Sequence, residues 1–324
     1  MGKRLVLVTT GGTIAMVEDV RAGGAVPTLH GEDLLRHLPE GTFPVEVVEH
    51  SHLPSAHLTL EALWALRERV QALARDPGVQ GIVITHGTDT MEETAYLLDL
   101  TVEGEAPMVL TGSMRAASDP GYEGLANLAA AFRVAASPEA RGIGAVVVME
   151  DEVHAARAVT KMHTSSPRTF QSPFWGPLGR VEGERVFLRG RPPRHLLSCE
   201  RPEERVALIR LAVGMDDGFL RYALERGMRG VVIEALGGGR VPPWWMPSIC
   251  EAMARGVVVV IASRCPAGRV GDRYGYAGSC RELEAAGAVL ANGLSGPKAR
   301  LKLMVALGAG LGVEKCREAF AREP

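Results

Sequence analysis

Two threonines of this chain stand where a parallel β-sheet would expose reactive side chains. Thr13 follows the apolar run Leu5–Val8, and Thr88 follows the apolar run Gly81–Ile84. Buried parallel strands read as continuous apolar runs of this kind, and open α/β sheets bind ligands just past the carboxyl ends of their strands. Two hydroxyl groups and the adjacent carboxylate of Asp89 therefore predict a site for nucleophilic chemistry rather than a packing motif.

The first motif places Gly11 and Gly12 directly before Thr13. A threonine hydroxyl is a weak nucleophile, so it needs a base or a fixed polar environment. Glycine adopts unusual backbone dihedral angles and lets backbone N–H groups approach a ligand, where they can stabilise a developing oxyanion. Taken alone, the same three residues are equally typical of a phosphate-binding turn or of a tight exit from a strand.

The second motif combines His86, Thr88, Asp89 and Thr90 between an expected strand and an expected helix. A buried Asp89 would bind a substrate ammonium group while Thr88 holds or attacks a carbonyl group. Asp89 or Thr90, with the glutamates that follow, also resembles a helix capping box, which would explain one of these residues but not all. His86 is a candidate general base, although a histidine at the end of a strand is more often a hydrogen-bonded core residue.

Lys161 offers the third reactive group, and it is the only lysine between Lys3 and Lys298. A lysine needs a lowered pKa to act as a base, and burial lowers the pKa of an amine. Together, Thr88, Asp89 and Lys161 would form a hydroxyl–amine–carboxylate relay, which follows the logic of a Ser–His–Asp triad with lysine in place of histidine. Considered by itself, Lys161 reads as a solvated surface charge, and only the fold can bring it to Thr88.

The chain of 324 residues is long for one domain and predicts two. Its net charge of −2 gives no reason to expect nucleic acid or an anionic membrane as a partner. The five cysteines are odd in number and lack C-x-x-C spacing, so neither a disulfide scaffold nor a structural zinc site is expected. No signal peptide or membrane-spanning run is recognisable, which indicates a soluble cytoplasmic protein.

Alternating apolar runs and amphipathic segments predict an α/β fold of parallel βαβ units. We expect two α/β domains, a larger N-terminal one with a doubly wound sheet and a smaller C-terminal one with a parallel sheet. The N-terminal domain, which carries the threonines, covers residues 1–188. The Pro- and Arg-rich segment 189–204 is a linker, and the C-terminal domain covers residues 205–324.

Hydrophobic periodicity locates the individual elements of both domains. Strands are expected at Leu5–Val8, Pro44–Glu49, Gly81–Thr85, Met108–Thr111, Ala145–Met149, Val206–Leu211, Gly230–Glu234 and Val257–Ala262. Helices are expected at Leu60–Leu73, Thr90–Leu100, Gly124–Ala136, Phe219–Arg226, Pro247–Arg255 and Pro297–Leu307.

The segments Thr10–Ala15 and His86–Thr94 resemble the two signatures of the bacterial-type L-asparaginases and glutaminase-asparaginases. The pairing of both motifs at this separation is highly specific, and the resemblance covers essentially the whole chain. It continues through Thr111–Arg115, Thr160–Lys161, Thr169–Pro173, Gly176–Gly179, Ser263–Arg264 and Gly296–Arg300.

The resemblance implies a hydrolase that converts L-asparagine to L-aspartate and ammonia through an acyl-enzyme, without a cofactor or metal. It implies a homodimer or homotetramer acting on a small molecule. Thr13 matches the family's nucleophile, and Thr88, Asp89 and Lys161 match its second catalytic group. The matching substrate-binding residues are Gly12, Ser55, Gly87, Thr88, Asp89 and Ser113. In the family pattern Asp89 binds the substrate's amino group, Ser55 binds its carboxylate, and the backbone carbonyl of Ser113 faces the leaving amide.

The loop after the first motif departs from the family pattern. Many members carry there a tyrosine that activates the nucleophilic threonine, whereas the first tyrosine of this chain is Tyr96. The segment Met16–Val26 is expected to be a mobile lid that excludes water. Between Met16 and His30 the polar candidates for activating Thr13 are Glu18, Asp19, Arg21 and His30. What removes the proton from Thr13 therefore stays open at this stage.

Three alternatives to a free-standing L-asparaginase remain. The first is a glutaminase-asparaginase of broad specificity. The second is the ammonia-producing subunit of a tRNA-dependent amidotransferase, a group that carries extra domains before the asparaginase unit; a first strand at Leu5 disfavours it. The third is a non-catalytic α/β protein that binds an amino acid or a partner. The missing tyrosine supports this third alternative, and the joint presence of Thr13, Thr88, Asp89 and Lys161 opposes it.

Overall fold

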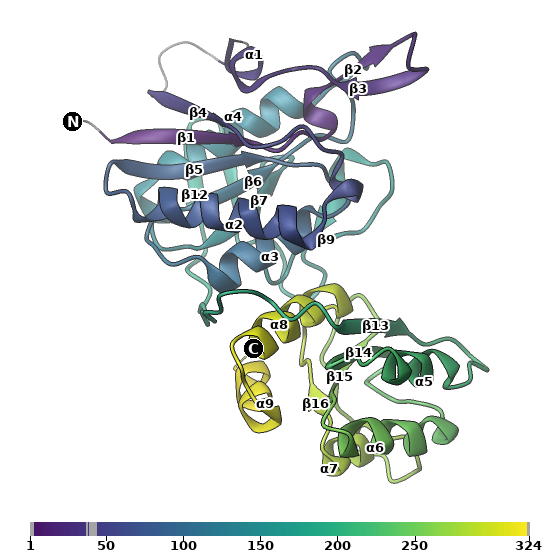
Figure 1. Cartoon of the computed structure of the whole chain (residues 1–324). Helices are drawn as coiled ribbons and strands as arrows, with labels where there is room; N and C mark the ends of the chain where they lie inside the picture. The colour runs from purple at the N-terminus through teal and green to yellow at the C-terminus, as the bar shows by residue number, and fades with distance from the viewer. Residues whose placement is uncertain (1–2, 37, 39–43, 323–324) are drawn as a thin grey trace. The chain divides into compact units, whose positions relative to one another are not determined.

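The chain folds into two α/β units, which confirms the expected fold class. The computed structural model describes residues 3–36, 38 and 44–322, and it divides the chain after Leu196 (Figure 1). Each unit has its own sheet and its own hydrophobic core. Among the described residues, no helix has both the length and the apolar character that a bilayer crossing requires.

The first unit is built on an eight-stranded sheet in the order β12-β11-β8-β7-β6-β5-β1-β4. The strands are β1 (Arg4–Thr9), β4 (Val45–Glu49), β5 (Val79–Thr85), β6 (Met108–Thr111), β7 (Ala145–Met149), β8 (Glu152–Ala155), β11 (Gly179–Glu182) and β12 (Arg185–Leu188). From β4 to β7 all neighbours are parallel, as expected, but β8, β11 and β12 add antiparallel pairs. The sheet is therefore mixed. Its last three strands were missed because each has only four residues and contains charged side chains, so none forms a continuous apolar run.

Helices cover both faces of this sheet because successive side chains of a strand point in opposite directions. Leu5 and Leu7 of β1 belong to the core beneath α4 (Gly124–Ala136), whereas Val6 and Val8 belong to the core on the opposite face. That opposite core includes apolar residues of α2 (Leu60–Arg75) and α3 (Met91–Thr101). The short helix α1 (Gly31–Arg36) adds Leu34 to the α4 side. The continuous apolar runs in the sequence thus reflect burial on two sides.

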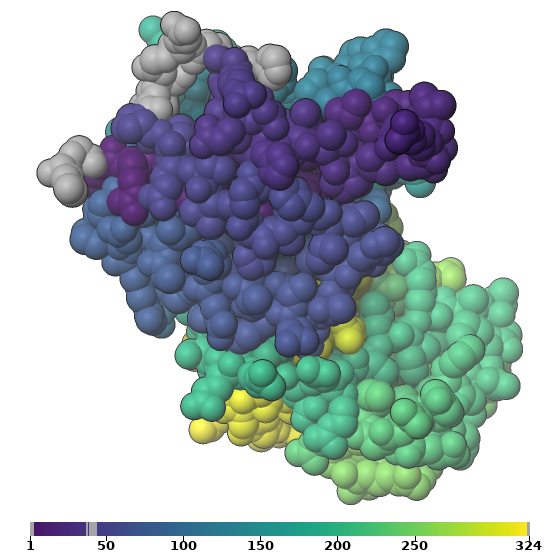
Figure 2. Space-filling model, turned by 45° about the horizontal axis from the view of Figure 1, so that its top comes forward, coloured from purple at the N-terminus to yellow at the C-terminus, as the bar shows by residue number. Residues whose placement is uncertain are grey.

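The segment after Thr13, for which a lid was expected, forms an antiparallel hairpin. Strands β2 (Met16–Asp19) and β3 (Gly24–Pro27) pair across a turn that contains Gly23, which has a φ of 70°. The backbone nitrogens of Thr28 and Leu29 both donate to Ala15 O, at 2.8 and 3.0 Å, and fix the base of the hairpin. Figure 2 shows the hairpin, in dark purple, as a protruding edge of the first unit.

The second unit contains a parallel sheet in the order β13-β14-β15-β16. Its strands are β13 (Val206–Arg210), β14 (Gly230–Ala235), β15 (Val258–Ser263) and β16 (Val289–Leu290). Its helices are α5 (Gly218–Glu225), α6 (Met246–Ala254), α7 (Cys280–Ala286), α8 (Gly296–Gly308) and α9 (Val313–Ala321). Fully buried Trp245 lies in its core. The sequence pattern did not reveal β16, α7 or α9.

Residues 189–205 contain no helix or strand, yet Arg194 ties this segment to the first unit. The Arg194 Nε atom donates to Asp99 Oδ1 at 2.8 Å, and its Nη2 atom donates to the backbone oxygens of Asp99 and Val102 at 2.8 Å each. Burial raises the pKa of Asp99, and the Arg194 charge opposes that rise. The ion pair therefore keeps a buried carboxylate satisfied at the end of α3.

Candidate active site

Three loops at one edge of the large sheet carry most of the residues predicted from the sequence. Strands β1, β5 and β6 are neighbours, and Thr85 lies opposite both Thr9 and Thr111 in register. The segments that follow these strands therefore begin side by side at the carboxyl edge of the sheet, which is where α/β proteins bind ligands. These segments contain Thr13, Thr88 and Ser113.

The loop that carries Thr13 and the loop that carries Thr88 are in contact through Gly12 and Gly87. Gly12 has a φ of 87°, and a methyl group added to it would come within 2.4 Å of the Gly87 nitrogen. A methyl group added to Gly87 would come within 2.6 Å of Ser55 Oγ. A larger side chain would displace backbone at Gly12 and the Ser55 side chain at Gly87. Thr13 follows Gly12 and Thr88 follows Gly87, so the contact between these glycines brings the two threonine loops together. The buried Ser55 lies next to Gly87.

Lys161 reaches the second threonine from a short antiparallel ladder of β9 (Thr160–Lys161) with β10 (Phe170–Gln171). Its Nζ atom lies 2.9 Å from Thr88 Oγ1 and 2.7 Å from Asp89 Oδ1. The structure therefore brings together the three groups of the expected relay. The Lys161 side chain is 16% exposed, whereas that of Asp89 is 62% exposed, so the expectation of a buried aspartate was wrong.

The Thr90 side chain does not cap α3, as the alternative interpretation of this motif would have required of it. Thr90 occupies the N-cap position, but its side chain makes no capping hydrogen bond. Its hydroxyl instead donates to Ser55 O at 3.1 Å, and Thr160 Oγ1 donates to Glu92 Oε1 at 3.1 Å. The first contact holds the Ser55 turn against Thr90, next to the loop that carries Thr88, and the second holds β9 against α3.

Ser113 follows Gly112, whose backbone packs against the loop that carries Thr88. A methyl group added to Gly112 would come within 2.4 Å of His86 O, which places this turn against the second threonine loop. Ser113 is fully buried, its hydroxyl donates to Arg115 O, and Arg115 N donates back to Ser113 Oγ at 3.1 Å. Since the hydroxyl is engaged within its own turn, a role through the Ser113 backbone fits the geometry better.

Two family descriptions match the chain consecutively. Residues 4–194 match the N-terminal asparaginase domain, and residues 205–320 match the C-terminal domain of glutaminases and asparaginases. The chain belongs to the asparaginase family. This family assignment confirms the resemblance inferred from the two threonine motifs and makes the protein an amidohydrolase.

Relatives of this family align over nearly the full chain. The L-asparaginase of Bacillus licheniformis is 37% identical over 95% of this chain and 97% of its own length. The probable L-asparaginase of Deinococcus radiodurans is 39% identical over 98% of this chain and 97% of its own length. The crystal structure of a probable cytoplasmic L-asparaginase from Campylobacter jejuni superimposes with a TM-score of 0.87. It is 29% identical and covers 98% of this chain and 99% of that one.

The asparaginase site contains a tyrosine that sequence reasoning missed. Tyr122 donates from its hydroxyl to Ile14 O at 2.7 Å, within the 3₁₀ turn Thr13–Ala15. Burial and the neighbouring Glu123 charge raise the pKa of Tyr122, so it is a poor base. It therefore anchors the turn that presents Thr13 rather than replacing the absent loop tyrosine. No local pattern links two residues that are 108 positions apart.

Thr13 itself is half-buried at the start of that turn. Within the described part of the chain, no hydrogen bond joins its hydroxyl to Thr88, Asp89 or Lys161. A cavity of about 290 Å³ lies beside the relay and is lined by Asp89, Lys161, Met162, His163 and Thr164. A larger cavity of about 690 Å³ lies around β8 and β11 and contains none of the predicted site residues.

His86 is a core residue of this asparaginase site and not its base. Its side chain is fully buried, its Nδ1 atom lies 2.7 Å from Gly87 O, and its Nε2 atom lies 2.9 Å from Thr94 Oγ1. Burial lowers the pKa of His86 to about 4, so the ring is neutral at pH 7. The structural alternative favoured for this histidine from the sequence is therefore confirmed.

The buried His86 should make the protein sensitive to acid. Because the unfolded state has a His pKa near 6.5, it binds more protons than the folded state between about pH 6.5 and 4. The stabilisation is complete above pH 6.5 and is lost as the pH falls towards 4. We expect wild-type protein to lose up to about 3 kcal/mol more unfolding free energy over this range than His86→Gln.

Urea unfolding of both proteins at several pH values measures this difference. His50 and His154 also have lowered pKa values, but they are present in both proteins and cancel in the comparison. Equal slopes of stability against pH in wild type and His86→Gln would contradict the assignment of a neutral, buried His86.

Proposed function

We propose that this chain is an L-asparaginase that hydrolyses its substrate through an ester on Thr13, with Thr88, Asp89 and Lys161 as the proton relay. The observation that carries the proposal is the pair of hydrogen bonds from Lys161 Nζ to Thr88 and Asp89, beside the backbone contact of Gly12 with Gly87. Family membership and the similarity to relatives named L-asparaginase support the same reaction.

In the first half-reaction, Thr13 Oγ attacks the side-chain amide carbon of asparagine. The new C–O bond forms as the carbonyl electron pair moves to oxygen, and backbone N–H groups near Gly12 and Thr88 stabilise the resulting oxyanion. As Thr13 attacks, its hydroxyl proton passes to the Lys161 relay. The tetrahedral intermediate then re-forms the carbonyl group and breaks its C–N bond, and the leaving nitrogen takes up that proton and departs as ammonia. The product is an aspartyl ester on Thr13.

In the second half-reaction, water gives up a proton to the relay as its oxygen attacks the ester carbon. The C–O bond to Thr13 then breaks, Thr13 Oγ takes up the proton, and aspartate is released. Lys161 and Thr88 are hydrogen-bonded, so a proton can pass between the amine and the hydroxyl without rearrangement of the site. Lys161 must be neutral when it accepts that proton. The Asp89 carboxylate, 2.7 Å from the amine, then stabilises the ammonium ion that forms.

Substrate binding follows from the same residues. Ser55 lies against Gly87 and would receive the substrate's α-carboxylate, whereas the exposed Asp89 carboxylate would bind its α-amino group. The Ser113 backbone would face the leaving amide. We extend the proposal to the organisation of the chain, with the site residues in an N-terminal domain of residues 1–188. Residues 189–204 would be the linker, and residues 205–324 the C-terminal domain. We also propose that the protein is a cytoplasmic homodimer or homotetramer. Phe174 and Trp175, each about half exposed, support contact between copies.

Ammonia release from L-asparagine and L-glutamine, measured side by side over a range of concentrations, tests this function. We expect turnover of L-asparagine with a higher kcat/KM than that of L-glutamine. Thr13→Ala protein prepared in the same way serves as the blank, because it reports any asparaginase carried over from the expression host. Wild-type protein that releases no more ammonia than this blank from either amide would contradict the proposal.

A further inference from the structure

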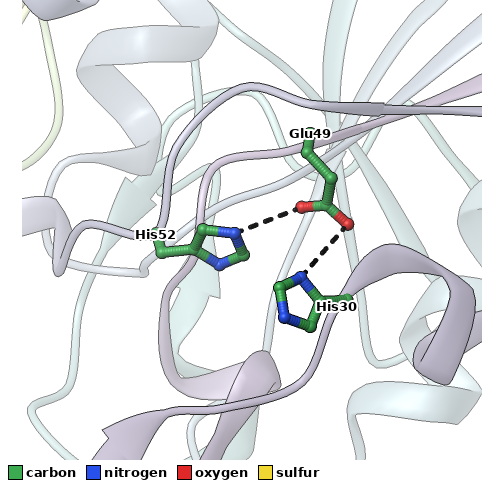
Figure 3. Close-up of side chains that lie close together, drawn as sticks. All are labelled: His30, Glu49 and His52. Carbon is green, nitrogen blue, oxygen red and sulfur yellow. Dashed lines mark ion pairs between the residues drawn. The ribbon is translucent and has the colours of Figure 1, made fainter.

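Two histidines and a glutamate meet outside the residues proposed for catalysis. Figure 3 shows His30 and His52 on either side of the Glu49 carboxylate. His30 Nδ1 lies 3.9 Å from Glu49 Oε1, and His52 Nε2 lies 3.5 Å from Glu49 Oε2. The two rings are 5.0 Å apart and inclined by 77°. His30 precedes α1, Glu49 ends β4, and His52 lies in the turn that follows β4.

The spacing of these groups leaves room for an ion between them. Both histidine–carboxylate distances exceed the usual 2.7–3.2 Å of a hydrogen bond, and one potential ligand atom from each residue lies within 4.8 Å of the others. Ligand atoms about 2.0–2.1 Å from a tetrahedral zinc ion would lie roughly 3.4 Å apart. Small rotations of the exposed His30 and His52 side chains can supply the remaining approach.

The carboxylate between the two rings is already held in place. Glu49 Oε1 accepts a hydrogen bond from Gly31 N at 2.6 Å, and Glu49 Oε2 accepts one from Thr9 Oγ1. A methyl group added to Gly31 would come within 2.6 Å of Val47 Cγ1, so only glycine allows this close approach. Fixed outer contacts of this kind orient a ligating carboxylate and strengthen metal binding.

We propose that His30, Glu49 and His52 bind one divalent transition-metal ion of the zinc class, with water completing its coordination. Two imidazoles and one carboxylate suit Zn²⁺, Co²⁺ and Ni²⁺, whereas Mg²⁺ and Ca²⁺ prefer sites made of oxygen atoms. The cysteine pattern argued against a zinc site with cysteine ligands, but this proposed site contains only histidine and glutamate ligands. The ion lies outside the proposed catalytic chemistry.

Such an ion would clamp the exit of the hairpin to the sheet. His30 stands three positions beyond Pro27, the last residue of β3. Glu49 is the last residue of β4, and His52 stands three positions beyond it. The bound ion would thus link the β3–α1 connection to β4 and add to the hydrogen bonds that Thr28 and Leu29 donate to Ala15. Because the ion binds the folded arrangement, it should raise the unfolding temperature of the protein.

The test uses full-length protein freed of metal with a chelator, and it needs no substrate. Isothermal titration with ZnCl₂ should give one ion per chain, and excess Zn²⁺ should raise the unfolding temperature by several degrees while Mg²⁺ does not. CoCl₂ should produce visible absorption bands. His30→Ala and His52→Ala should each weaken Zn²⁺ binding at least about tenfold and remove the temperature shift.

Two further variants keep the outcome interpretable. His195→Ala is the matched control, because it removes a histidine outside the cluster and should bind Zn²⁺ like wild type. Glu49→Gln keeps an oxygen that can accept a hydrogen bond from Gly31 or Thr9 but removes the charge, so it should weaken binding without unfolding the protein. Absence of binding by wild type, equal binding by His52→Ala, or an equal shift with Mg²⁺ would overturn the site. Each result is independent of asparagine hydrolysis.

Discussion

Replacing Thr13 with alanine should lower kcat for L-asparagine by at least roughly 10⁴-fold, as removal of a hydrolase nucleophile does. The hydroxyl has no substitute in the proposed first half-reaction, because Thr88 is already bonded to Lys161. Thr13 is half-buried and its hydroxyl makes no hydrogen bond to Thr88, Asp89 or Lys161 within the described part of the chain. Its removal should therefore change the unfolding free energy by no more than about 1 kcal/mol.

Thr13→Ser is the matched control for this experiment, since it keeps the hydroxyl and removes only a methyl group. It should retain readily measurable turnover, and both variants should unfold at nearly the wild-type temperature. Steady-state ammonia release and thermal unfolding, measured on the same preparations, separate loss of chemistry from loss of structure. Substantial activity in Thr13→Ala would transfer the nucleophile to Thr88.

The predictability of the fold depended on how strongly each element is buried. Strands β6 and β7 and helix α4 match the sequence-based ranges at both ends because apolar side chains fill nearly every buried position. The hairpin of β2 and β3 did not, because its strands have only four residues each and follow no clear alternation of apolar and polar side chains. They pair with each other and are held by contacts at the base of the hairpin. A single window of sequence shows only the hydrophobic periodicity of its own residues. It therefore does not reveal a strand that forms by pairing with a distant segment or that has little periodicity.

The site shows the same division between local and long-range information. Thr88 and Asp89 are adjacent in the sequence, so their joint presence in one loop followed from the strand before them. Lys161 is 72 positions from Asp89 and stands on a two-residue strand, which no periodicity can reveal. The contact of Gly12 with Gly87 depends on the order of β1 and β5 in the sheet and was equally invisible.

Lys161→Met should lower the rate of ester formation by about 10²–10⁴-fold, the range expected for loss of a positioned acid–base group. The amine is the group bonded to both Thr88 and Asp89, and methionine has similar length without a proton to exchange. Because Asp89 is 62% exposed, water can solvate its carboxylate after the amine is lost, so the fold should persist. Single-turnover measurements of ammonia and aspartate report the two half-reactions separately.

Lys161→Arg distinguishes proton transfer from charge at this position. Arginine keeps the positive charge and the hydrogen-bond donors, but it does not give up a proton in proteins. If Lys161 relays protons, both variants should be impaired alike; if its charge alone matters, Lys161→Arg should stay active. A rapid release of ammonia by Lys161→Met without aspartate would confine the relay to ester hydrolysis. Thr13 would then need a base other than Lys161 for ester formation.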